Sequence, residues 1–292
     1  MYETCKAARF ACSLALNSTE WCSLVTIYRN YLQAGGSGVD EILRTMEELK
    51  RRAKRGEVVA PLFCMARNNI PRRDKGPDAT LQCLAPSDAA IVTMQTRIQR
   101  ELLPKANERR LRVPMLAEND GSVVLGIRVG AASVLLGADL EEKNRRGLGW
   151  QVILDGCQPG EPKYGGFKIP HHGSETGHHP STWPTMMTPD AWAAVTPFNR
   201  QKDPLPRKED CVRILQMTEH AYITAPAGFG RFRHSDSAVQ KTMAEAALAI
   251  GTELSKQGHI RFRKSCTDSA KAWSTELFGN AVHLREYLAM AK

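Results

Sequence analysis

The sequence predicts a mixed α/β fold, and three observations lead to this prediction. The chain has 292 residues, enough for a sizeable core in one large domain or two small ones. Its residues, 42% hydrophobic and 24% charged, have a globular composition that excludes disordered, collagen-like and coiled-coil classes. Beyond residue 56, short runs rich in Val, Leu and Ile alternate with helix-like segments, which favours one α/β domain with insertions.

Residues 1–55 are predicted to be helical. Apolar residues between Trp21 and Leu32 recur at three- and four-residue spacing and form one stripe. Glycines at 35, 36 and 38 end this helix, and Asp40 suits the N-cap of a second one. The basic run 50–55 ends the second helix, where cations match the negative end of the helix dipole. A nucleic-acid contact is the alternative interpretation of this run.

Strands and further helices are expected from residue 58 on. Apolar runs predict strands at 58–65 and 80–84, and a helix follows from Ser87 or Asp88 to about Leu103. Residues 122–129 and 133–136 predict a β-hairpin. Later strands are expected at 167–169, 193–196, 221–224 and 259–263, and later helices at 237–256 and 273–291. We therefore expect a helical segment (1–55), a core (56–235) and a C-terminal helical extension (236–292) within a single domain.

Cysteine usage and charge indicate the compartment and the partners. The eight cysteines include no C-x-x-C pair and stand mostly among apolar residues, which predicts reduced thiols in a cytoplasmic protein. No apolar run approaches the roughly 18–20 residues of a membrane span, so we expect no membrane contact. The net charge of +9 favours an anionic partner such as nucleic acid.

Histidines gather in one short segment. None of the eight precedes His171, and four lie within residues 170–179 (Pro-His-His-Gly-Ser-Glu-Thr-Gly-His-His). Imidazole is the commonest metal ligand, and a histidine just past a buried strand is held rigidly. The segment is therefore either a metal site at the end of the strand 167–169 or a solvent-exposed loop. Upstream, the apolar run 133–138 delivers Asp139, which either binds a metal or caps the next helix.

Together these segments resemble the metallo-β-lactamase superfamily, in particular its ComEC-like branch. The resemblance rests on residues 119–125 (Asn-Asp-Gly-Ser-Val-Val-Leu), 134–139 (Val-Leu-Leu-Gly-Ala-Asp) and 168–174 (Lys-Ile-Pro-His-His-Gly-Ser), in this order. Two further segments support the resemblance: Leu84–Ser87, and the expected strand at 193–195 that Asn199 follows. The resemblance then covers about residues 56–235. One departure is Ala138, where the family usually has glycine.

The resemblance implies an αββα sandwich with metal ions, zinc or manganese, at one edge of two sheets. Asp139 matches the carboxylate that bridges two metals, and His171 and His172 match the late histidine ligand. These three are the expected catalytic and metal-binding residues, with Ser174 and Asn199 supporting them. The family's chemistry is hydrolysis by metal-activated water, and we expect a phosphodiester as substrate.

The sequence lacks the H-x-H-x-D-H motif that supplies the first metal site in this superfamily. Three explanations stay open: a shortened N-terminus, a partner chain that completes the site, or a scaffold that binds nucleic acid or a protein without catalysis. Because this chain supplies two or three ligands, we expect it to bind the metal weakly or not at all unless another chain supplies further ligands. Outside the histidine segment, aromatic residues alternate with Arg231, Arg233, Arg261 and Arg263. These arginines either contact nucleic acid or form the wet face of edge strands.

Overall fold

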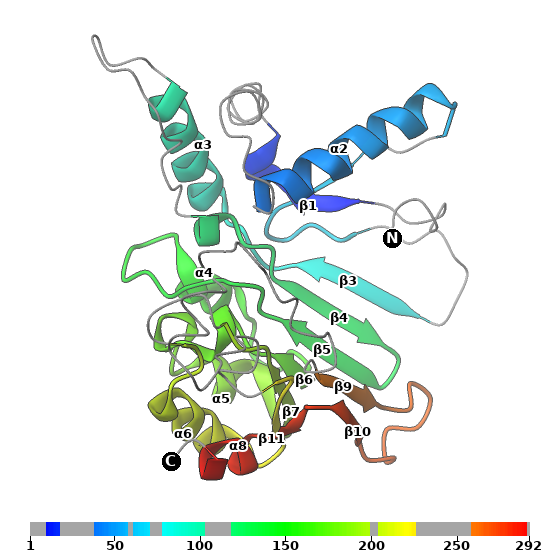
Figure 1. The fold of residues 1–292 in the computed structure, drawn as a ribbon, viewed down its shortest axis with the longest axis vertical. Coiled ribbons are helices and arrows are strands. Elements are labelled where there is room, and N and C mark those ends of the chain that lie inside the picture. The colour runs from blue at the N-terminus through cyan, green and yellow to red at the C-terminus, as the bar shows by residue number, and fades with distance from the viewer. Residues whose placement is uncertain are drawn as a thin grey trace, which may run out of the picture. The chain divides into compact units, whose positions relative to one another are not determined.

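The structure is a computed structural model, and it describes residues 10–17, 38–57, 61–70, 78–102, 118–198, 204–225 and 258–290 (Figure 1). Within these ranges the predicted mixed α/β fold is confirmed. The helices are α2 (Gly38–Lys54), α3 (Asp88–Leu102), α4 (Gly149–Gly156), α5 (Thr182–Met186), α6 (Lys208–Met217) and α8 (Leu284–Met290). None of these helices combines the length and the hydropathy that crossing a membrane requires.

Seven strands form one mixed sheet in the order β11-β8-β7-β6-β5-β4-β3. Pairing is parallel from β5 through β6 and β7 to β8, and antiparallel between β8 and β11. The strands of this sheet are β3 (Ala79–Cys83), β4 (Leu125–Val129), β5 (Ala132–Leu136), β6 (Tyr164–Lys168), β7 (Met187–Val195), β8 (Ala221–Ile223) and β11 (Val282–His283). The predicted β-hairpin is confirmed as β4 and β5, which are neighbours in the sheet and turn at Gly130.

The chain divides into two compact units. One comprises Met1–Lys75, Thr80–Gly126 and Leu140–Gly156, and the other comprises Gly76–Ala79, Ile127–Asp139 and Cys157–Lys292. We call them the first and the second unit. The sequence-based expectation of a single domain stays a prediction.

In the first unit, α3 presents an apolar stripe to the interior. Ala90, Ile91, Met94 and Ile98 are buried at three- and four-residue spacing, while Val92 between them is 61% exposed. Ser87 caps the helix, because its hydroxyl accepts a hydrogen bond from the Ala90 amide at 3.2 Å. The predicted helix from Ser87 or Asp88 is thereby confirmed.

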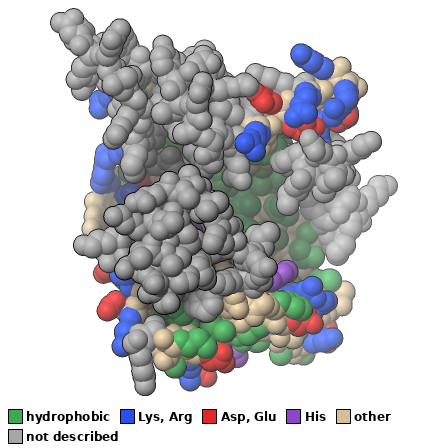
Figure 2. All heavy atoms as spheres, viewed as in Figure 1, with side chains coloured by type: hydrophobic (Ala, Val, Ile, Leu, Met, Phe, Trp, Pro, Cys, Tyr) green, Lys and Arg blue, Asp and Glu red, His purple; other side chains and the backbone are tan. Residues whose placement is uncertain are grey.

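Helix α2 corresponds to the predicted second helix, but it begins at Gly38, so the expectation that Asp40 is its N-cap is wrong. Its basic end is only partly solvated. Arg51 and Arg55 are exposed, but Arg52 is 1% exposed and pairs with the buried Glu48 at 3.4 Å. Figure 2 shows Lys and Arg side chains interleaved with acidic ones on this helix. Opposite charges already partner these cations, which weakens the interpretation of this end as a nucleic-acid contact.

In the second unit, β9 (Gly258–Arg263) and β10 (Ser274–Gly279) form a separate antiparallel pair. Phe262 of β9 packs edge-on against Trp192 and Tyr222 of the large sheet, with ring centroids 5.7 and 5.6 Å apart. Trp273 lies over Gly165 and Gly166 of β6, where a Cβ atom on Gly165 would come within 2.9 Å of the indole nitrogen. The two glycines therefore leave the space that the indole ring fills.

Two of the predicted helical regions are wrong in part. Ala11–Ser13 is a strand, β1, which pairs in parallel with β2 (Leu62–Cys64). Of the helix expected over 273–291, only α8 forms, because Thr275 and Leu277 pair with Phe262 and Ile260 across the β9–β10 ladder. In both cases pairing with another strand overrides a local helical pattern. The helices expected at 21–32 and 237–256 lie outside the described residues.

Candidate functional site

The candidate site lies in the second unit, where three parallel strands end side by side. Asp139 follows β5, His171 and His172 follow β6, and Thr196 follows β7. In open α/β sheets, ligands commonly bind beyond the carboxyl ends of the strands. The sheet topology thus brings together residues that are 24 or more positions apart in the sequence.

His172 faces Asp139 with a defined ring nitrogen. Its Nε2 lies 3.8 Å from Oδ1 of Asp139, and its Nδ1 lies 2.9 Å from the carbonyl oxygen of Thr196. A carbonyl oxygen can only accept, so Nδ1 carries a proton and donates it. In the neutral ring, Nε2 then has its lone pair on the side of Asp139. Phe198 stacks on the imidazole at a centroid distance of 5.0 Å and fixes the plane of the ring.

His171 is held differently. Its Nδ1 lies 2.8 Å from the hydroxyl of Thr176, and Oγ of Ser174 lies 3.2 Å from the same hydroxyl. Ser174 also accepts a weak hydrogen bond from the Thr176 amide at 3.4 Å. Ser174 therefore contacts the turn that holds His171, whereas the pair with Asp139 is formed by His172.

The backbone around the site adopts conformations that L-residues avoid. Ala138, His171 and His172 have φ values of 48°, 44° and 55°, in the left-handed region that favours glycine. The His171 amide donates to the Ala138 carbonyl at 3.0 Å, which ties the two strained segments together. Such strain persists only where surrounding bonds enforce it, and it clusters at functional sites. The left-handed φ of Ala138 also explains why glycine suits this position.

Lys168 adds a positive charge at the same strand ends. Its ammonium donates to the Ile169 carbonyl at 3.2 Å, and burial lowers its pKa, while the negative charge of Asp139 opposes that effect. The motif at residues 168–174 contains Lys168, but the sequence indicates no role for it. Thr196 could not be predicted from the sequence, because a backbone carbonyl can come from any residue type.

The remaining expected residues divide into two groups. Arg261 and Arg263 lie on the exposed face of β9, and both bond to Glu276 at 3.1 Å. These arginines therefore lie on the solvent-exposed face of a strand, and the carboxylate of Glu276 partly neutralises their positive charge. Asn199, Arg231 and Arg233 lie outside the described residues.

A metal centre with three ligands is not assembled in the part of the chain that the structure describes. There, no group of three or more His, Cys, Asp or Glu side chains is placed to hold one ion. Asp139 and His172 offer two donors, of the imidazole and carboxylate types that zinc and manganese accept.

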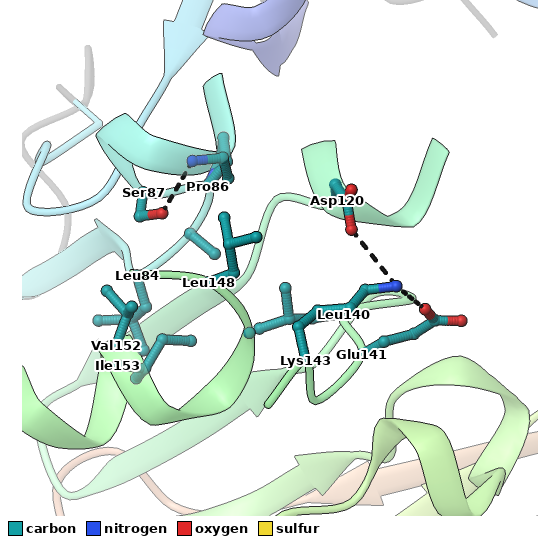
Figure 3. Close-up of a pocket in the computed structure, with 13 residues that line it drawn as sticks. Leu84, Pro86, Ser87, Asp120, Leu140, Glu141, Lys143, Leu148, Val152 and Ile153 are labelled. Carbon is teal, nitrogen blue, oxygen red and sulfur yellow. Dashed lines mark hydrogen bonds and ion pairs between the residues drawn. The ribbon is translucent and has the colours of Figure 1, made fainter. Parts of the chain in front are cut away.

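A second feature lies in the first unit and is shown in Figure 3. The ammonium of Lys143 pairs with the carboxylates of Glu141 and Asp120, and its Nζ lies 3.4 Å from Oδ1 of Asp120. The guanidinium of Arg97 lies 2.9 Å from Oδ2 of Asp120. Burial alone would lower the pKa of Lys143, but the two carboxylates outweigh it and raise the pKa. Asn119 donates to Glu141 at 3.1 Å.

The pocket beside these charges is narrow and mostly apolar. The larger apolar side chains that line it are Leu84, Pro86, Leu140, Leu148, Val152 and Ile153 (Figure 3). Lys143 pairs with Glu141 and Asp120, and the Ser87 hydroxyl donates to the Gly147 carbonyl at 2.6 Å, while Oδ1 of Asp120 makes an ion pair but no hydrogen bond with a described residue. These contacts fasten the 140–148 loop to the loop that carries the Asn119 motif. We therefore assign the cluster a structural role.

Comparisons of the chain with protein-family models, curated proteins and solved structures found no match.

Proposed function

We propose that the chain is a metal-dependent hydrolase with a metallo-β-lactamase-like fold and that its substrate is a phosphodiester in nucleic acid. The observation that carries the proposal is the pair of His172 Nε2 and Asp139 Oδ1, 3.8 Å apart at adjoining strand ends. In a tetrahedral site with bonds of about 2.0–2.2 Å, neighbouring ligand atoms lie roughly 3.3–3.6 Å apart, so a small adjustment would let both atoms bind one ion.

The contacts around the pair support a ligand role. A metal-binding histidine usually donates its other ring N–H to a carbonyl or carboxylate, which fixes the tautomer. His172 makes this contact with Thr196. Asp139 is 49% exposed, so its carboxylate is accessible to an ion from solution. A plain ion pair would not require the Nδ1 contact.

The chemistry follows from the donor set. Bound here, a divalent ion would polarise a phosphoryl oxygen and lower the pKa of a coordinated water to about 7. Asp139 and His172 would hold the ion, Thr196 would hold the imidazole in its ligating tautomer, and Lys168 would contribute positive charge for an anionic substrate. The phosphodiester class rests on the net charge of +9 and on the resemblance of the motifs.

A second candidate function is a subunit that supplies half of a metal site or binds nucleic acid without catalysis. The observation that favours it is that the described residues provide two ligands, whereas a catalytic zinc site needs three and a bound water. A partner chain would then bring the remaining ligands.

Hydrolysis assays separate the two candidates. The wild-type chain and the variants Asp139→Asn, His172→Asn and His171→Asn are each assayed with added Zn²⁺ or Mn²⁺. The substrates are bis(p-nitrophenyl) phosphate and a single-stranded oligonucleotide. The hydrolase proposal expects metal-dependent turnover that falls at least about a hundredfold in the first two variants, because a coordinating group is lost. Turnover that is absent from wild type with either metal, or equal in all variants, would reject it in favour of the half-site subunit.

A further inference from the structure

A second small pocket lies in the second unit, beside the turn that carries His171 and His172. Its floor is apolar and includes Trp183, which is 8% exposed and packs edge-on against Phe167 at 5.4 Å. Its described polar lining consists of Ser174, His178, His179, Thr182 and Arg213. No carboxylate is among these residues, and the narrow space has room for about one water-sized group.

One polar atom in this pocket has no partner. Thr182 is 3% exposed, and its hydroxyl makes no hydrogen bond to any described residue. Leaving a buried hydroxyl unpaired is unfavourable, so such an atom indicates a bound group that completes it. Thr182 is one of the residues that line the pocket, and its hydroxyl oxygen exposes almost no surface, so a partner in the pocket would reach it after a small rotation of the side chain.

The charged side chains around the pocket indicate which charge the missing partner would carry. Arg213 reaches the pocket from α6, donating to the Gly173 carbonyl at 2.6 Å and pairing with Asp210 at 2.8 Å. Burial lowers the pKa of His178, and the positive charges of Arg213 and His179 lower it further, while Glu175 opposes them. Among the described residues that line the pocket, Arg213 carries the one permanent positive charge, and although Asp210 pairs with it, a guanidinium beside the pocket suits an anion better than a neutral water.

We propose that this pocket is an oxyanion site, in which an oxygen of a phosphate group accepts hydrogen bonds from the Thr182 hydroxyl and the His178 ring beside the Arg213 guanidinium. The pocket is too narrow for a whole phosphate, so one oxygen enters and the remainder stays at the mouth. The site does not depend on a metal ion or on hydrolysis. If the proposed function holds, the phosphate would be a terminal phosphate of a nucleic acid bound across the turn.

The test is a titration of the full chain with inorganic phosphate, with chloride at equal ionic strength as reference. Ring resonances of His178 are followed by NMR in wild type, in Thr182→Val and in Thr185→Val. Thr185 is exposed on the same short helix, so its variant is a matched control. We expect saturable shifts of His178 and a raised His178 pKa in wild type and in Thr185→Val. The affinity should fall about tenfold in Thr182→Val.

Two further arms complete the experiment. His178→Asn, followed by calorimetry, should weaken phosphate binding by a similar factor, and Asp139→Ala should bind phosphate as wild type does. A 5′-phosphorylated dinucleotide that competes where its unphosphorylated form does not would identify nucleic acid as the source. Absence of saturable phosphate shifts at His178, or equal affinity in Thr182→Val and Thr185→Val, would overturn the proposal and leave a buried water as the occupant.

Discussion

The backbone conformation of single residues is where the site differs most from ordinary loop structure. Ala138 combines a φ of 48° with an exposed side chain, so its methyl group contributes strain and little packing. Its neighbour Gly137 is restricted differently, because a Cβ there would lie 2.9 Å from Cβ of Pro170 and 3.0 Å from the Lys168 carbonyl. The two positions therefore respond in opposite directions to exchange between alanine and glycine.

Ala138→Gly should stabilise the protein by about 1 kcal/mol, because the left-handed conformation costs glycine nothing. Gly137→Ala should destabilise it by about 1–3 kcal/mol through overpacking. Urea denaturation of both variants at pH 7 measures the difference. A destabilised Ala138→Gly would show that φ at this position is not left-handed in solution.

Part of the candidate site could be predicted at this scale. A carboxylate and a histidine pair placed after consecutive apolar strands are expected to meet when the strands are parallel, and Asp139 and His172 do meet. The choice between His171 and His172 could not be predicted, since it depends on backbone φ and on contacts with Thr176 and Thr196. The Thr182 pocket was missed because Arg213 reaches it from a helix some 30 residues later in the chain.

At the scale of elements, helix α4 shows how a loop residue sets a helix start. The sequence offered Asp139 as a cap for the next helix, but the carboxylate of Glu142 accepts from the amides of Trp150 and Gln151 at 3.1 and 3.2 Å. These contacts span eight and nine residues, which is longer than the local capping pattern that a sequence can show.

Glu142→Ala should lower the free energy of unfolding by about 0.5–2 kcal/mol, because two helix amides lose their acceptor. Glu142→Gln keeps an acceptor without the charge and should lose less. Thermal denaturation of Glu142→Ala and Glu142→Gln tests whether the first variant loses more stability than the second. Glu286→Ala, at an exposed position in α8, is the control. Equal melting temperatures for wild type and Glu142→Ala would contradict this assignment of the cap.

The strand β6 and the indole of Trp273 form a second coupled pair of elements. Gly165→Ala would place a methyl group 2.9 Å from the indole nitrogen, so we expect a loss of about 1–3 kcal/mol. In a Trp273→Ala background the same change should cost less than about 0.5 kcal/mol, since the clash is gone. The double-mutant cycle measures this coupling, and additive effects would refute it.

These elements also show where local sequence patterns suffice. Helix α3 and the β4–β5 hairpin carry their own signals, a cap and apolar stripe in one and a glycine turn in the other. Strands β1 and β10 do not, because their extended conformation comes from pairing with β2 and β9. Only the partner strand, which is distant in sequence for β1, determines such short segments.

For the whole molecule, the relevant quantity is the net charge of +9. If nucleic acid is the partner, oligonucleotide affinity should fall steeply with salt, with a slope of about −0.7 per neutralised phosphate. Arg261→Gln and Arg263→Gln should weaken binding, while Glu276→Gln should strengthen it by freeing both guanidinium groups. Fluorescence anisotropy between 50 and 300 mM salt measures this, and a flat profile would argue against a nucleic-acid partner.

The most direct measurement for the central claim is metal binding by isothermal titration with zinc. Wild type and the variants Asp139→Ala, His172→Ala and His171→Ala are compared under identical conditions. We predict binding that weakens at least about tenfold in Asp139→Ala and His172→Ala and is retained in His171→Ala, whose side chain bonds to Thr176. Equal zinc binding in wild type, Asp139→Ala and His172→Ala, or none in wild type, would contradict a metal-ligand pair in this chain.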